Sequence, residues 1–175
     1  KISFKEWRKH CGVVMQEGFI FGDTIANNIV PDGNMIDKKR LLYAVEMANI
    51  RDFVESLPLK YNTKIGNTGQ GLSQGQKQRI LIARAIYRNP DYLFFDEATN
   101  ALGTDNEKVI QGNLEKFFKD KTVVIVAHRL STVKNADQIV VLKEGEITEK
   151  GTHDELITRQ GDYYRLVKNQ LELSA

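Results

Sequence analysis

The chain has 175 residues, of which 41% are hydrophobic and 27% are charged, with 25 Lys and Arg against 23 Asp and Glu. This length fits one domain or most of one, and the near balance of charges excludes the basic excess of a typical nucleic-acid-binding protein. A single cysteine excludes a disulfide framework, and no apolar run approaches the about 18 residues of a membrane-crossing helix.

The first strand is expected at residues 11–15 (CGVVM), a short apolar run, with Gln16 at its carboxyl end. Residues 16–29 are then expected to form a loop that carries Phe19, Ile20 and Phe21. Aromatic residues in a loop either plug the core or form a docking surface. On the residues alone, the core plug is the favoured interpretation.

Two helices are expected next, at residues 36–48 and at residues 51–57, where Pro58 stops the second. A turn rich in glycine and serine follows, GLSQGQ at residues 71–76. Ser73 and Gln76 have the spacing of a capping box, and Gly75 lets the backbone approach a ligand closely. Because free N–H groups and the positive end of the helix dipole meet there, the turn suits a phosphate.

A basic helix is expected from Lys77 to Arg88, ended by Asn89 and Pro90. One face is an apolar stripe and the other carries lysine and arginine. Because carboxylates lie nearby in the sequence, structural salt bridges are favoured over DNA binding for this basic face.

The apolar run at 91–97 (DYLFFDE) indicates a strand that is buried on both faces of a parallel sheet. Asp96 and Glu97 fall at its carboxyl end, where open α/β sheets bind ligands. One carboxylate can hold Mg²⁺ while its neighbour reaches a water molecule. An isolated Asp-Glu pair would more simply cap the strand end, but the GLSQGQ turn upstream favours the catalytic interpretation.

Downstream, a helix is expected from Thr104 to about Phe118, and a buried strand at 121–127 ends at His128. Residues 138–142 and 146–150 flank Glu144 and Gly145 as a hairpin. A last helix, at about 154–171, is capped by Thr152 and Glu155, and His153 is expected on the surface.

The stretch GLSQGQKQRILIARA resembles the signature motif of the nucleotide-binding domains of ABC transporters, and YLFFDEA resembles their Walker B strand. The resemblance runs from about residue 6 to 171. It implies an α/β fold of the P-loop NTPase (ABC ATPase) type, with a mostly parallel core sheet and a helical signature subdomain. Residues 30–90 would form that subdomain, and residues 11–16 and 91–175 the catalytic core.

The resemblance also implies ATP and Mg²⁺ as cofactors. Asp96 would hold Mg²⁺ through water, and Glu97 would be the general base for hydrolysis. Gln16 would sense Mg²⁺ and the attacking water, and His128 would bond the γ-phosphate. In the signature turn, the residues expected to bind ATP are Leu72, Ser73, Gly75 and Gln76.

The family further implies a membrane-spanning partner, on the same chain or a separate subunit, and a second nucleotide-binding domain, as a homodimer. No nucleic-acid partner is expected. The place of action would be the cytoplasmic face of the cell membrane, in a bacterium, with export of a peptide or bacteriocin, a drug or a lipid. The alternatives are a soluble ABC-type ATPase and a non-catalytic interaction module.

No string of the P-loop type, G-x-x-x-x-G-K-[ST], occurs in the sequence. Residues 1–175 are therefore interpreted as the C-terminal part of an ATP-binding domain, truncated upstream of the P-loop. By itself this part is expected to be inactive as an ATPase and to associate through exposed apolar surface. Gly103 also stands where the family has an aspartate.

Overall fold

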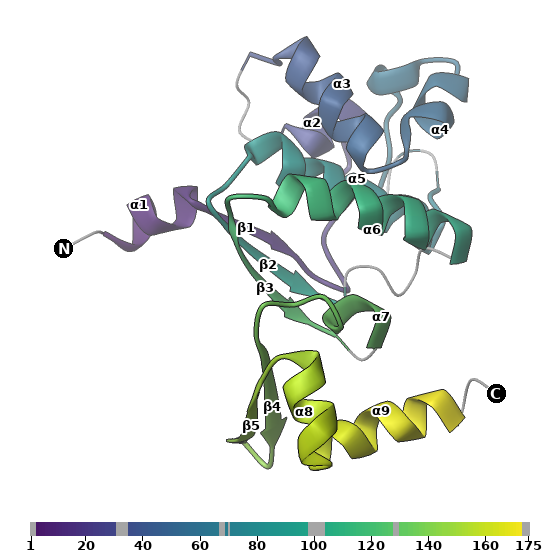
Figure 1. Ribbon diagram of the computed structural model, residues 1–175. Coiled ribbons are helices and arrows are strands. Elements are labelled where there is room, and N and C mark those ends of the chain that lie inside the picture. The colour runs from purple at the N-terminus through teal and green to yellow at the C-terminus, as the bar shows by residue number, and fades with distance from the viewer. Residues whose placement is uncertain are drawn as a thin grey trace. The chain divides into compact units, whose positions relative to one another are not determined.

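The structure is a computed structural model that describes residues 3–30, 35–66, 69, 71–97, 104–127 and 130–172, without the side chains of 104–107, 130–131 and 171–172. The chain divides into two compact units, residues 1–126 and residues 127–175, and each is described by itself (Figure 1).

The first unit is built on a parallel sheet of three strands in the order β1 (Cys11–Val14), β2 (Tyr92–Asp96) and β3 (Thr122–Val126). Residue Val13 pairs with Phe94, and Phe94 pairs with Val124. A short helix, α1 (Phe4–Lys9), precedes β1. The parallel sheet that the sequence predicts is therefore present, with β2 in its centre.

Only one face of this sheet is fully buried. Leu93 and Phe95 point into a core shared with Ile86 of the central helix, whereas Val13 is 56% exposed and Val124 is 48% exposed on the opposite face. The prediction that the strand at 91–97 is buried on both faces is wrong, because Phe94 is 37% exposed. We call this second side the exposed sheet face; it consists of Val13, Met15, Phe94, Val124 and Val126.

The core is organised by α5 (Gln74–Arg88), which lies between the sheet and the smaller helices. Its apolar residues are almost entirely buried, as its amphipathic pattern predicts. The helix ends at Asn89, which has a left-handed φ of 46°, and Pro90 follows. The predicted end is thus confirmed, and the helix begins at the predicted Ser73 cap.

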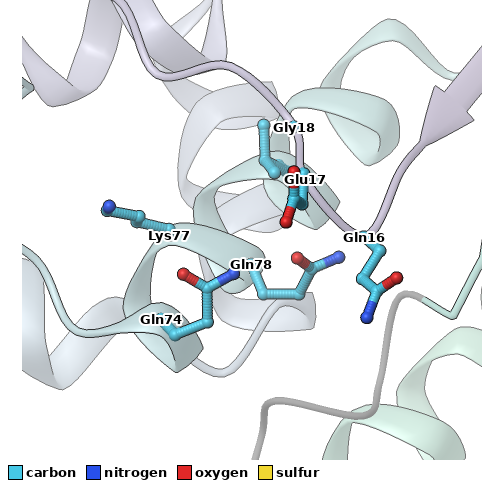
Figure 2. A pocket seen from close by; sticks show the side chains of 7 residues that line it. Gln16, Glu17, Gly18, Gln74, Lys77 and Gln78 are labelled. Atoms are coloured by element: carbon cyan, nitrogen blue, oxygen red, sulfur yellow. The ribbon is translucent and has the colours of Figure 1, made fainter.

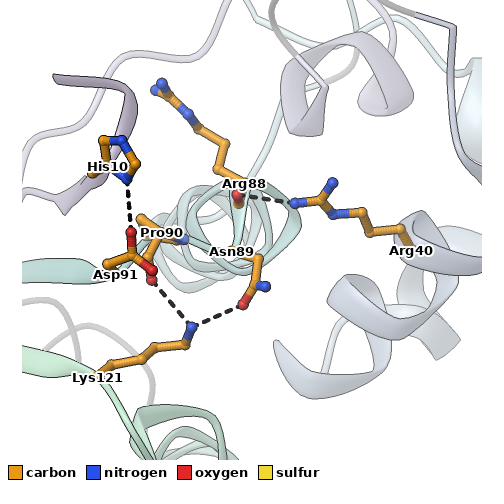
Figure 3. Close-up of polar contacts among 7 residues, drawn as sticks. All are labelled: His10, Arg40, Arg88, Asn89, Pro90, Asp91 and Lys121. Carbon is orange, nitrogen blue, oxygen red and sulfur yellow. Dashed lines mark hydrogen bonds and ion pairs between the residues drawn. The ribbon is translucent and has the colours of Figure 1, made fainter. Parts of the chain in front are cut away.

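Polar contacts fix the turn between α5 and β2 (Figure 3). The Lys121 ammonium donates to Asn89 Oδ1 at 2.9 Å and to the Pro90 carbonyl at 3.1 Å. His10 Nδ1 lies 2.7 Å from Asp91 Oδ2. These contacts join the beginnings of all three strands to the end of α5. The carboxyl ends of the strands, where the sequence places the candidate site residues, therefore lie at the opposite edge of the sheet.

Smaller helices cover α5 on the side away from the sheet: α2 (Ile25–Ile29), α3 (Lys38–Met47), α4 (Arg51–Ser56) and the 3₁₀ turn Lys60–Asn62. The helix α6 (Thr104–Phe118) completes the unit. The helices expected near α3, α4 and α6 are confirmed. The helix α2 lies where a loop was expected; Thr24 caps it by accepting a hydrogen bond from the Asn27 amide.

The second unit consists of α7 (Leu130–Val133), the antiparallel strands β4 (Ile139–Lys143) and β5 (Glu146–Gly151), α8 (His153–Arg159) and α9 (Asp162–Glu172). The predicted hairpin is confirmed. Glu144 and Gly145 both have positive φ, 52° and 84°, as a tight hairpin turn requires. Its small core is formed by Ile139, Val141, Leu156, Tyr163 and Val167.

Two predictions for the C-terminal segment are wrong. The single helix expected at about 154–171 is two helices, because Gln160 adopts a left-handed φ of 54° and ends α8. His153 is half-buried rather than on the surface, and its Nδ1 lies 2.8 Å from the hydroxyl of the buried Tyr163. The capping box of Thr152 and Glu155 is confirmed.

Candidate functional site

The parallel strands bring several predicted site residues to one edge of the sheet. Gln16 lies just beyond β1 and is exposed, and Asp96 ends β2, half-buried. Because β1 and β2 run in the same direction and are paired in register, these ends meet at the same edge. His128, at the corresponding end of β3, lies outside the described residues, as does Gly103.

Glu97 leaves the strand rather than continuing it. Its φ is +48°, and its N–H donates to the Val126 carbonyl at 3.0 Å. A left-handed conformation is unfavourable for a residue other than glycine or asparagine, so the bond to β3 helps to hold it. The strand therefore ends at Asp96, and the chain turns at Glu97.

The signature turn has the predicted capping box. The Gln76 N–H donates to Ser73 Oγ at 3.2 Å, and the Ser73 N–H donates to Gln76 Oε1 at 2.9 Å. The Gln76 side chain is therefore used by the cap, and the Leu72 side chain packs against the core. What remains for a ligand is the Ser73 hydroxyl hydrogen and the N–H groups of the first helical turn, including that of Gly75.

A pocket of about 240 Å³ lies between the loop after β1 and the beginning of α5. Figure 2 shows the side chains of Gln74 and Gln78 rising from α5 toward the loop that carries Gln16. Amide groups thus dominate the polar lining. The complete lining is Gln16, Glu17, Gly18, Gln74, Lys77, Gln78 and Leu81.

Gln78 is a site residue that sequence reasoning missed. It is only 2% exposed, and its Nε2 donates to the Met15 carbonyl at 3.4 Å, which joins α5 to the strand end that precedes Gln16. A signal was available, because Gln78 lies on the same helix face as Leu81 and Ile82. A polar residue within an apolar stripe needs a buried partner.

The aromatic residues after Gln16 are not a core plug. Phe19 is 66% exposed and Phe21 is 45% exposed, and their rings meet edge to face with centroids 5.1 Å apart. Ile20, between them, is half-buried and packs against the core. The core-plug interpretation is wrong for the two aromatic residues, which present an apolar surface to solvent.

Among the described residues, no salt bridge joins the basic face of α5 to a carboxylate, contrary to the interpretation from the sequence. Arg79 donates to the carbonyls of Gly75 and Asn49, at 3.3 and 2.8 Å. Arg84 donates to the carbonyls of Asn28 and Phe19, at 2.6 and 3.0 Å. Burial lowers the pKa of both guanidinium groups from the usual arginine value, because it disfavours the charged form.

The donor set at the strand ends fits Mg²⁺ better than a transition metal. Asp96 offers carboxylate oxygens and Gln16 an amide oxygen, and hard cations prefer such ligands. Within the described residues, no group of three or more His, Cys, Asp or Glu side chains could enclose a metal. At nucleotide sites Mg²⁺ is usually held by one or two protein ligands together with phosphate oxygens and water.

Comparison with known proteins gives the same family as the motifs. The profile of the family described as ABC transporter matches residues 1–100. The chain is 48% identical over 168 residues to ATP-binding cassette sub-family B member 5 of Mus musculus. It is 43% identical over 171 residues to the ATP-dependent lipid A-core flippase of Syntrophus aciditrophicus. It covers 13% of the first relative and 28% of the second.

A solved structure shows the same fold. A bacterial Atm1-family ABC exporter with ATP bound superposes with a TM-score of 0.90 and 37% identity, over 95% of this chain and 30% of that one. The relatives include animal, plant, amoebal and bacterial proteins, so the expected bacterial origin stays a prediction. None of the helices within the described residues is long and apolar enough to span a membrane. The chain belongs to the ABC transporter family, as an ATP-binding domain with the P-loop NTPase fold.

Proposed function

We propose that this chain belongs to the domain that binds and hydrolyses ATP in an ABC exporter. The observation that carries the proposal is the convergence of Gln16, Asp96 and Glu97 at one edge of a parallel sheet. A helix N-terminus capped by Ser73 lies in the same unit, as a phosphate-binding site requires. The strong similarity to exporters along almost the whole chain supports the same function.

The site residues have distinct roles in this proposal. When bound, Mg²⁺ would neutralise charge on the phosphates, and Asp96 would hold it through water. Glu97 would accept a proton from the attacking water, and Gln16 would orient that water. His128 would bond the γ-phosphate. Positioning and charge stabilisation provide most of the catalysis in phosphoryl transfer, so small displacements of these side chains would be costly.

The signature turn would act on the ATP of a second copy of the domain. Ser73 is exposed, and its hydroxyl hydrogen is not used by the cap, so it can donate to a phosphate that arrives from outside the chain. The first-turn N–H of Gly75 would add a second donor. A head-to-tail pair of domains would therefore complete two sites at once.

The exposed pair Phe19 and Phe21 supports docking to the membrane-spanning part of the exporter, at the cytoplasmic face of the membrane. Interfaces are enriched in aromatic residues that bury large area with little loss of side-chain freedom. Among the relatives are proteins named multidrug resistance protein and lipid A-core flippase. These names favour a drug or a lipid over a peptide or bacteriocin as the exported compound.

The test is ATP hydrolysis by the full-length exporter that contains this chain, reconstituted in lipid. Glu97→Gln keeps the shape of the side chain but removes the proton acceptor, so turnover should fall by about 100-fold or more while ATP binding is retained. Glu115→Gln, on the exposed side of α6, is the matched control and should hydrolyse ATP at the wild-type rate. Unchanged turnover in Glu97→Gln would refute the assigned role.

A further inference from the structure

Asn28 is a completely buried polar side chain whose hydrogen bonds reach the loop after Gln16, the helix α2 and the helix α5. Its Oδ1 accepts from the Phe21 N–H at 2.8 Å, and its Nδ2 donates to the Phe21 carbonyl at 3.0 Å. The same Nδ2 donates to the Thr24 carbonyl at 3.0 Å. The amide thus pairs with both backbone groups of Phe21, as a neighbouring strand would.

Arg84 of α5 connects this arrangement to the signature helix. Its Nε donates to the Asn28 carbonyl at 2.6 Å and its Nη2 to Asn28 Oδ1 at 3.3 Å, while Nη1 donates to the Phe19 carbonyl at 3.0 Å. The guanidinium carbon also lies 5.2 Å from the centre of the Phe21 ring. The planar guanidinium group of Arg84 therefore contacts the loop at both exposed aromatic residues, Phe19 and Phe21.

An arginine in this setting is unusual, because its described acceptors are backbone carbonyls and an amide and not a carboxylate. Removing a charge from water is costly when these acceptors are all neutral. An arginine at position 84 is therefore not explained by a need for surface solubility. A lysine could not replace it, since a single ammonium cannot reach three acceptors in a fixed plane.

Two further contacts join α5 to the same loop. A Cβ at Gly18 would lie 2.3 Å from Leu81 Cδ1, so the loop backbone lies directly on the helix. Gln78 donates to the Met15 carbonyl at 3.4 Å. Positions 78, 81 and 84 are successive points of contact along one side of α5, from the pocket to the exposed aromatic pair.

We propose that Arg84 and Asn28 form a latch that makes the aromatic pair Phe19 and Phe21 and the signature helix move as one body. Arg84 is a positioning residue in this proposal: it touches no nucleotide, but it transmits displacement between the docking surface and the Ser73 turn. The inference rests on the proposed function, because it needs nucleotide at the turn and a membrane partner at the aromatic pair.

The experiment follows amide hydrogen exchange in the full-length exporter, with and without MgATP. In the wild-type protein, MgATP should slow exchange in the segment 18–23 as well as at the beginning of α5. In Arg84→Lys, exchange in 18–23 should rise about tenfold and lose its response to MgATP, while the Kd for MgATP stays within about twofold. Arg88→Lys, at an exposed position one turn further along the same helix, is the control and should keep the response.

The possible failures can be told apart. If the wild-type exporter does not bind MgATP, the proposed function fails. If MgATP binds and Arg84→Lys responds in 18–23 as the wild type does, the latch fails while the function stands. If Arg84→Lys speeds exchange in 18–23 equally with and without MgATP, so that the response to MgATP is kept, Arg84 has a purely structural role and the latch fails. If Arg84→Lys does not fold, native-state hydrogen exchange of the wild-type protein provides the test. The latch requires the amides of residues 19, 21 and 84 to have the same free energy of opening. Different opening free energies would overturn the latch.

Discussion

Gly18 and Leu81 are so close that a Cβ at position 18 would overlap Leu81 Cδ1, so a larger residue there requires the Leu81 side chain to shift. The loop that carries the site therefore rests on the middle of α5. This contact fixes the depth of the pocket between Gln16 and the helix, because the loop cannot move toward α5 and has polar ties on either side.

Gly18→Ala should destabilise the fold by about 1–2 kcal/mol, because the added methyl group forces Leu81 out of its place in the core. Urea unfolding measures the change. In the double variant with Leu81→Ala, the cost should be smaller than the sum of the two single costs, since the second change makes room for the first. Additive costs would show that the two positions do not compete for the same space.

Gly112→Ala is the matched control for that experiment. Gly112 lies inside α6, and a Cβ there would meet nothing within 4 Å. Because alanine favours the helix and restricts the unfolded chain, this variant should gain about 0.5–1 kcal/mol in the same assay. A loss instead of a gain would mean that α6 packs against something at Gly112.

The local parts of the fold were predictable from the sequence, because their causes are local. The Ser73 cap, the end of α5 at Asn89 and the hairpin at Glu144 each depend on residues within four positions of one another. The placement of the candidate site residues directly after the strands was also predictable, because the carboxyl ends of parallel strands lie at one edge of the sheet.

The parts that failed depend on distant contacts or on weak signals. The helix α2 has five residues, too few for a clear periodicity, and its Asn28 makes sense only beside Arg84, 56 positions later. The break at Gln160 uses a left-handed residue that is not glycine. The exposure of Val124 could not be read from its strand, because an apolar run is the same whether one face or two are covered.

Lys121 is predicted to stabilise the turn between α5 and β2. Its ammonium donates two hydrogen bonds there and lies 5.0 Å from the centre of the Phe117 ring. Lys121→Ala should therefore cost about 1–2 kcal/mol in urea unfolding. Lys119→Ala, at an exposed position, should change stability by less than about 0.5 kcal/mol. Equal effects of the two variants would show that the contacts of Lys121 contribute nothing.

The exposed sheet face is predicted to make the 175-residue chain associate. Val13 and Val124 flank Phe94 on neighbouring strands, so these three side chains form a continuous apolar surface. The double variant Val13→Thr and Val124→Thr keeps the β-branched shape but adds two hydroxyl groups. Light scattering at high micromolar concentration should show a smaller mean mass for the variant, with an unchanged circular dichroism spectrum. A strictly monomeric wild type would contradict the prediction.

Asp23 is predicted to make the beginning of α2 sensitive to acid. Its carboxylate accepts from the Thr24 N–H at 2.6 Å and from Asn27 Nδ2 at 3.1 Å, and these bonds, the first above all, lower the pKa of Asp23 below its usual value. A carboxyl group with a lowered pKa in the folded state stabilises the fold above its unfolded pKa of about 3.9. That contribution is lost as the pH falls through the folded pKa.

Comparison of Asp23→Asn with the wild type by thermal unfolding checks this prediction. At pH 7 the variant should melt at a lower temperature, because a neutral amide oxygen is a weaker acceptor for the Thr24 N–H than a carboxylate. The difference in Tm should shrink as the pH falls through the folded pKa of Asp23, because the wild-type carboxyl group then becomes protonated as well. Asp52→Asn, at an exposed position of α4, is the control for the loss of one carboxylate away from these two bonds, and at pH 7 it should lower Tm less than Asp23→Asn does. If the difference in Tm between Asp23→Asn and the wild type is the same at pH 7 and in acid, the effect comes from the shape of the side chain and not from its charge.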